Sequence, residues 1–189
     1  GLDYPPGSYA DTDELVELTA EAARAGGFYH THVRYPLGDR FLDPFREAIE
    51  IGRRGGGATH ITHFYHRQTF PQGPEPMLAL VDDANAEGLY VTFDTYPYEW
   101  ASTRLLVMIP PWVQSGSTEA TLARLAAASV RERIRRELAD RGVLFAGERA
   151  WDDVRLGAFT TIALLPWEGR TLGELIRGKE RVPELRAGE

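Results

Sequence analysis

Three stretches of the sequence share one arrangement: glycine that would end a preceding helix, then a short apolar segment, then a polar residue at the end of that segment. His32, His63 and Asp94 occupy the equivalent last positions, and successive members are 31 residues apart. About 30 residues is the natural length of a unit of one strand and one helix. The spacing is therefore evidence of a structural repeat and does not by itself indicate a functional site. Strands that alternate with helices join through right-handed crossovers into a parallel sheet. The spacing therefore predicts an α/β fold of repeated parallel βα units.

Apolar residues at three- and four-residue spacing indicate helices between these strands, and each helix ends at glycine. The expected helices cover residues 11–25, 43–54 and 77–87, and the expected strands lie within 26–34, 58–64 and 89–94. In parallel sheets of this kind, sites form beyond the carboxyl ends of the strands. We therefore expect the polar residues that end the three strands to lie at one edge of the sheet.

The repeat breaks after the third strand. We expect an aromatic loop over residues 96–104 and an apolar segment over 105–112, followed by one or two helices over 118–141. Strands are expected over 143–145 and 154–165, and a short helix over 171–177. The chain is accordingly divided into three parts: βα units over residues 1–103, a lid or inserted subdomain over 104–165, and a short helix with a tail over 166–189.

Composition narrows the class of protein. The formal charge of -7 and the pI of about 5.3 give no basic footprint for nucleic acid or an anionic membrane surface. We expect no membrane span and no secretory leader, because the sequence lacks a run of about 18 apolar residues and a basic then apolar start. The chain has no cysteine, so disulfides are excluded. A cytoplasmic location is the default expectation.

The histidines carry the clearest chemical signal. On a strand His30 and His32 share one face, whereas His60 and His63 face opposite sides and require a bend to reach one ion. One imidazole from each strand end, His32 and His63, is therefore the more economical metal pair. A catalytic zinc takes three protein ligands, and Asp94 is either the third ligand or a carboxylate that orients an imidazole.

Other chemistries fit the sequence less well. A lone strand histidine is more often packed or hydrogen-bonded than a ligand, and we expect this for His30, His60 and His66. The sequence has no Gly-x-Ser-x-Gly motif and no cysteine nucleophile. Its three glycines at 55–57 precede a strand and not a helix, which is the wrong order for a phosphate-binding loop.

Eight stretches, in order along the first 115 residues, resemble the D-aminoacylase (N-acyl-D-amino-acid deacylase) family of the amidohydrolase superfamily. They are Gly1–Ala10, Thr12–Leu15, Gly26–Arg34, Glu47–Gly52, Ile61–His63, Ala86–Val91, and Asp94–Tyr98 with Ser102–Thr103. The resemblance implies a zinc-dependent (β/α)8 TIM barrel with a small inserted subdomain, of which this chain is the middle part. It also implies hydrolysis of the amide of N-acyl-D-amino acids, in which water activated by zinc attacks the carbonyl carbon.

Carried over position by position, the resemblance makes His32 and His63 metal ligands. It also implies that Tyr4, Arg34, Tyr96 and Ser102 contact the substrate, and Tyr65 is a fifth candidate for such a contact. Tyr65 stands where the family usually has a lysine, since Ser-His-Leu-Lys is replaced by Thr-His-Phe-Tyr.

The family's first-strand His-x-His, its bridging ligand and its late catalytic aspartate have no counterpart between Gly1 and Glu189. The catalytic base is therefore unassigned, and activity of the chain on its own stays open. The alternative hypothesis is a non-catalytic α/β domain that binds a small molecule or a partner chain. Unpaired edges of an incomplete barrel predict that the chain forms homo-oligomers.

Overall fold

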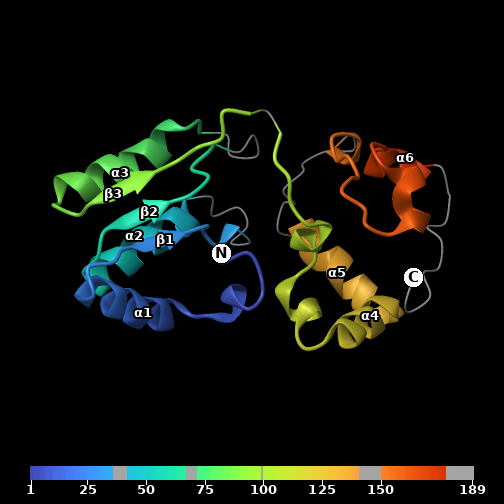
Figure 1. The fold of residues 1–189 in the computed structure, drawn as a ribbon, viewed down its shortest axis with the longest axis horizontal. Helices are drawn as coiled ribbons and strands as arrows, with labels where there is room; N and C mark the ends of the chain where they lie inside the picture. The colour runs from blue at the N-terminus through green and yellow to red at the C-terminus, as the bar shows by residue number, and fades with distance from the viewer. Residues whose placement is uncertain (36–41, 67–71, 99, 141–149, 178–189) are drawn as a thin grey trace. The chain divides into compact units, whose positions relative to one another are not determined.

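The structure is a computed structural model that describes residues 1–35, 42–66, 72–98, 100–140 and 150–177 (Figure 1). The chain divides into two compact units, residues 1–143 and 144–189. Unit 1 contains the elements η1 (Gly7–Tyr9), α1 (Thr12–Arg24), β1 (Tyr29–Thr31), α2 (Asp43–Gly55), β2 (Thr59–Ile61), α3 (Glu75–Ala86), β3 (Val91–Phe93), η3 (Leu105–Met108), η4 (Pro111–Gln114), α4 (Thr118–Ala126) and α5 (Ala128–Asp140).

The three strands form one parallel sheet in the order β1-β2-β3. Tyr29 pairs with Thr59, which pairs with Val91, so the strands align at offsets of 30 and 32 residues, close to the repeat of 31 in the sequence. The expected α/β architecture of parallel βα units is therefore confirmed. The complete (β/α)8 barrel stays a prediction, because the described sheet has three strands.

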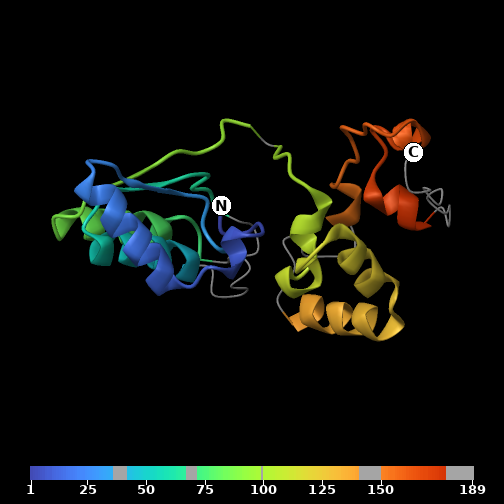
Figure 2. The same cartoon turned by 60° about the horizontal axis from the view of Figure 1, so that its bottom comes forward.

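Helices α1, α2 and α3 lie along one face of this sheet (Figure 2). Residues at alternate strand positions, Thr31, Thr59 and Ile61, are buried on that side. The core between the layers is built from Val33, Tyr35, Phe45, Ala48, Ile49, Ile61, Phe64, Met77, Val81, Ala84 and Val91. The intervening strand residues face away from the helices, since strand side chains alternate with period 2.

Helix α2 approaches its neighbours closely at two glycines. A Cβ atom on Gly52 would lie 1.8 Å from Thr59 Oγ1, and one on Gly55 would lie 2.5 Å from Thr19 Cγ2. Both distances are shorter than real Cβ contacts, so a larger residue would force Thr59 or Thr19 to shift, and glycine is favoured here although it costs helix stability. The close approach fixes how α2 sits against β2 and α1.

In the remainder of unit 1, the helical stretch expected over 118–141 is confirmed as two helices, α4 and α5. Ser117 caps α4, since its hydroxyl accepts a hydrogen bond from Ala120 N. In α5, Ile134 is buried.

Unit 2 contains η5 (Ala150–Asp152), η6 (Ile162–Trp167) and α6 (Leu172–Arg177). The predicted short helix over 171–177 is confirmed by α6, but the predicted strand over 154–165 is wrong. Arg155 forms an isolated bridge with Thr171, and the apolar residues that follow belong to η6, where Ile162 is exposed. An apolar run becomes a strand only where a neighbouring strand pairs with it. The strand expected over 143–145 lies outside the described residues.

Among the residues that the structure describes, no helix has the length and apolar content needed to cross a bilayer.

Candidate functional site

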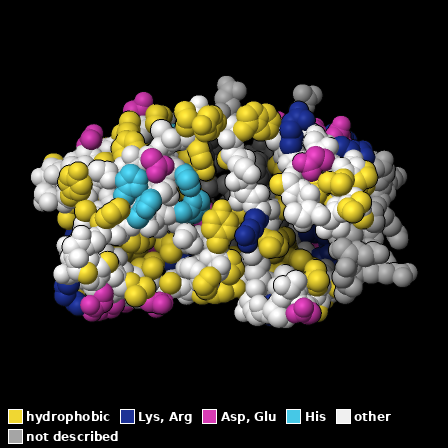
Figure 3. All heavy atoms as spheres, in the orientation of Figure 1, with side chains coloured by type: hydrophobic (Ala, Val, Ile, Leu, Met, Phe, Trp, Pro, Cys, Tyr) yellow, Lys and Arg dark blue, Asp and Glu magenta, His cyan; other side chains and the backbone are white. Residues whose placement is uncertain are grey.

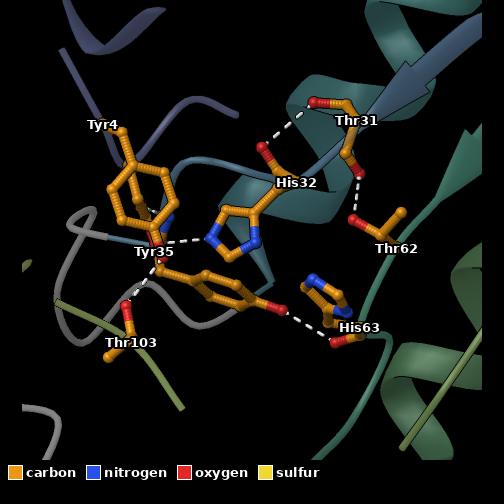
Figure 4. A network of polar contacts seen from close by, with 8 residues as sticks. Tyr4, Thr31, His32, Tyr35, Thr62, His63 and Thr103 are labelled. Atoms are coloured by element: carbon orange, nitrogen blue, oxygen red, sulfur yellow. Dashed lines mark hydrogen bonds and ion pairs between the residues drawn. The ribbon is translucent and has the colours of Figure 1, made fainter. Parts of the chain in front are cut away.

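His32 and His63 follow strands β1 and β2 and meet at the carboxyl edge of the sheet (Figure 4). Their imidazole rings lie edge to face, with centroids 5.3 Å apart and planes at 72°. Both side chains are partly buried, with exposed fractions of 17% and 32%. The structure therefore brings together the two histidines that the sequence analysis paired.

The imidazole of His32 is held by a carboxylate that the sequence analysis did not identify. Asp3 is 6% exposed, and its Oδ2 atom lies 2.8 Å from His32 Nε2. Its other oxygen, Oδ1, accepts a hydrogen bond of 2.8 Å from the backbone N–H of Tyr35. A carboxylate of this kind fixes the tautomer and orientation of a histidine. Nothing in the sequence around Asp3 indicates a partner 29 residues away, so only the fold reveals the pair.

His63 lies in the left-handed region of the backbone map, with φ at 59°. Histidine is one of the few non-glycine residues enriched in this region, and such conformations cluster at functional sites. Its backbone N–H donates to Asp94 Oδ1 at 2.9 Å, and its Nδ1 atom lies 3.8 Å from the same oxygen. Simple alternation along the strand would point His60 and His63 to opposite sides. The left-handed backbone at His63 supplies the bend that changes the direction of its side chain.

Two pKa shifts describe the charge of the site. Burial lowers the pKa of His63, and the nearby imidazole of His32 lowers it further. His63 is therefore neutral at pH 7, which is the form that binds a metal ion. The hydrogen bond from the backbone N–H of His63 lowers the pKa of Asp94, so this carboxylate is ionised.

Aromatic side chains surround the two imidazoles. The ring of Tyr96 stacks on His63 with centroids 4.7 Å apart, and Tyr4 lies 5.4 Å from His32. Tyr65 lies 5.7 Å from Tyr96 between ring centroids. Of the five predicted substrate contacts, Tyr4 and Tyr96 therefore lie directly against the histidine pair, and Tyr65 lies beside Tyr96.

A further hydroxyl, that of the buried Tyr35, donates to the backbone carbonyl of His63 at 2.9 Å (Figure 4). Tyr35 was not predicted to take part in the site. It connects both histidines, because its N–H donates to Asp3 and its hydroxyl fixes the backbone at His63.

The other two predicted substrate contacts lie differently. The guanidinium of Arg34 donates to Glu47 Oε2 at 3.2 Å and to the carbonyls of Ser8 and Ala10 at 3.1 and 2.8 Å. It therefore ties the N-terminal loop to α2. Ser102 is exposed and lies next to Thr103, whose hydroxyl is 2.9 Å from Tyr4 Oη. Contact of Arg34 and Ser102 with a substrate stays a prediction.

A second set of possible ligands lies on the sheet itself. The ligand atoms of His30, His60 and Asp94 all lie within 4.8 Å of one another. The sequence analysis had given both histidines packing roles. Histidine side chains accordingly gather in two neighbouring patches on one face of the molecule, beside an acidic side chain (Figure 3). His66 is partly buried and does not belong to this set.

Fold and site together define a parallel α/β domain with paired imidazoles at the carboxyl edge of its sheet. No protein-family model matches the chain. The chain is 37% identical over 109 residues to an N-acyl-D-glutamate deacylase of Alcaligenes xylosoxydans, and 33% identical over 107 residues to a D-aminoacylase of the same organism. Each match covers 56% of this chain and 22% of the relative, so the chain spans about a fifth of the relatives it matches. The predicted resemblance to the D-aminoacylase family is thereby confirmed.

Two solved structures are also similar. One D-aminoacylase, studied for its binuclear metal centre, is 21% identical and aligns over 98% of this chain and 32% of its own, with a TM-score of 0.59. That likeness supports the fold. An N-acyl-D-glutamate deacylase of Bordetella bronchiseptica, solved with zinc and a phosphonate inhibitor, is 33% identical over 52% of this chain and 21% of its own, with a TM-score of 0.47.

Proposed function

We propose that this chain carries part of the metal and substrate site of a zinc-dependent amidohydrolase that acts on N-acyl amino acids. The observation that supports this most strongly is the meeting of His32 and His63 at the carboxyl edge of a parallel sheet, with ring centroids 5.3 Å apart. The similarity to an N-acyl-D-glutamate deacylase and a D-aminoacylase gives the reaction class.

The residues present fit zinc. Imidazole nitrogen and carboxylate oxygen are preferred zinc donors, and this edge of the sheet offers both kinds. His63 is neutral at pH 7 because its pKa is lowered, and His32 is oriented by Asp3. Asp94, 3.8 Å from His63 Nδ1, is available either to orient that imidazole or to complete the ligand set. When bound, zinc polarises a carbonyl group and lowers the pKa of water.

The side chains of the chain itself bind and orient. Asp3 holds the ring of His32, and Tyr35 holds the backbone at His63, so the His32 imidazole and the backbone that carries His63 are fixed before any ligand arrives. The rings of Tyr4 and Tyr96 pack against His32 and His63, with centroids 5.4 and 4.7 Å away, and so reduce the exposure of the pair to water. The Tyr4 hydroxyl is a hydrogen-bond donor suited to a substrate carboxylate, although it now pairs with Thr103.

The test is hydrolysis of N-acetyl-D-glutamate by the full-length protein, measured as free glutamate after chelator treatment and return of zinc. We expect activity to need zinc and to be lost in His32→Ala and in His63→Ala. His66→Gln is the matched control, because it removes a histidine outside both sets, and it is expected to stay active. Hydrolysis that survives in His32→Ala or His63→Ala would contradict the proposal. A wild-type protein that binds zinc but hydrolyses no N-acyl amino acid would favour the non-catalytic alternative.

A further inference from the structure

The histidines that the proposed function does not use lie on the open face of the sheet. His30 on β1 and His60 on β2 are direct partners in the strand register, and His60 pairs in turn with Thr92 on β3. Their neighbours Thr31 and Ile61 are buried toward the helices, so the two imidazoles project from the opposite side. Asp94 lies two residues beyond Thr92, and its backbone N–H still donates to Ile61 O at 3.1 Å, so the extended pairing continues to it. Three adjacent strands therefore deliver two imidazoles and a carboxylate to one place.

The distances suit one small ion. His60 Nε2 lies 3.1 Å from Asp94 Oδ2, and the ligand atoms of all three residues lie within 4.8 Å of one another. Two ligands of a tetrahedral zinc ion are separated by about 3.3 Å, given metal–ligand distances of about 2.0 Å. The His60–Asp94 pair already has this separation. The exposed ring of His30 lies beside this pair, with its centroid 4.9 Å from that of His60.

Two of the three proposed ligands, His60 and Asp94, are also oriented by hydrogen bonds to neighbouring residues. His60 Nδ1 lies 2.8 Å from Thr92 Oγ1, which leaves Nε2 to face the Asp94 carboxylate. Asp94 Oδ1 accepts from the backbone N–H of His63, which leaves Oδ2 to face His60. Metal-binding histidines and carboxylates are oriented by such outer contacts. A simple hydrogen bond between His60 and Asp94 would account for these two residues alone. It would not account for the contact of Thr92 with His60 or for the adjacent imidazole of His30.

We propose that His30, His60 and Asp94 form a second divalent-cation site of zinc type, distinct from the His32–His63 pair. The cation is held by one nitrogen of each imidazole and by Asp94 Oδ2, with further positions open to solvent. The proposal goes beyond the amidohydrolase activity and does not depend on it. Asp94 faces both sites, one oxygen toward each, so a cation here also fixes the carboxylate beside His63.

The experiment is a titration of the chelator-treated chain with ZnCl2 and, separately, with CoCl2, whose visible spectrum reports nitrogen and oxygen ligands. It starts from the double variant His32→Ala/His63→Ala, which lacks the first pair. We expect this variant to bind about one equivalent of zinc. Adding His30→Gln should weaken that binding by at least about tenfold, because loss of a ligand costs no less than loss of its outer contact. Asp94 is not varied, since it touches both sites.

The second arm uses the otherwise wild-type chain, in case the double variant fails to fold. His30 is exposed, so His30→Gln leaves the core intact and should remove one of two zinc equivalents and change the cobalt spectrum. His66→Gln should keep both. A folded His32→Ala/His63→Ala chain that binds no zinc would overturn the proposal. So would a His30→Gln chain with the affinity and stoichiometry of wild type.

Discussion

The change Asp3→Asn isolates the part that the buried carboxylate plays in orienting His32. The substitution keeps the size of the side chain, and Asn Oδ1 still accepts from Tyr35 N, so the fold is preserved. What is lost is the charged partner 2.8 Å from His32 Nε2. Removing such an outer partner typically lowers metal affinity by about 10- to 100-fold. By the relation between free energy and affinity this is about 1.4 to 2.8 kcal/mol of zinc binding.

The assay is competition for zinc against a chromophoric chelator at pH 7, with urea unfolding in parallel. Asp3→Ala is the comparison, because it also leaves the buried N–H of Tyr35 without its acceptor and should cost about 1 to 3 kcal/mol of unfolding free energy. Asp82→Asn, an exposed carboxylate of α3, is the control and should change neither quantity. If Asp3→Asn bound zinc as tightly as wild type, the orienting role would be refuted.

Three further predictions concern the fold and the charge of the site. Gly55→Ala should destabilise the chain by about 1 to 3 kcal/mol in urea unfolding, because its Cβ would overlap Thr19, and a gain in stability would contradict the close approach of α2 to α1. Phe45→Ala should cost about 3 to 5 kcal/mol in the same assay, since Phe45 is fully buried in the core; a loss below 1 kcal/mol would show that the core is packed differently. The pKa of Asp94 is lowered below its ordinary 3.8, so wild type should lose stability relative to Asp94→Asn as pH falls below that value; a constant difference between pH 7 and pH 2 would contradict the shift.

The sequence predicted the repeated units well, because glycine stops and apolar spacing are local signals. The strands pair at offsets of 30 and 32 residues, so the equal intervals of 31 do not come from the register. His63 lies one residue beyond Thr62, the position that aligns with His32 and Asp94. Predicting that the two histidines meet required only the rule that sites form at the carboxyl ends of parallel strands.

Two features of the site lay beyond local signals. The pairing of Asp3 with His32 joins a loop to a strand end, and no periodicity connects them. Strict alternation gave His60 and His63 opposite directions, and the left-handed backbone at His63 ends that alternation one residue after Thr62. The set of His30, His60 and Asp94 was missed because it depends on the pairing of β1, β2 and β3 and on no single motif.

The irregular second part of the chain shows the same limit. Residues 154–165 have the apolar character of a strand, but no described strand lies beside them, and Ile162 remains 82% exposed within η6. A strand is defined by its partner as much as by its own residues. Sequence composition alone does not supply that partner.

The most direct test of a zinc pair at His32 and His63 is the zinc content of the purified chain, measured by mass spectrometry after saturation and dialysis. Wild type and the variant His32→Ala/His63→Ala are compared at pH 7, with circular dichroism to confirm that both are folded. We predict that the variant holds one zinc equivalent fewer than wild type. Equal zinc content in the two folded proteins would contradict the pair as a metal site.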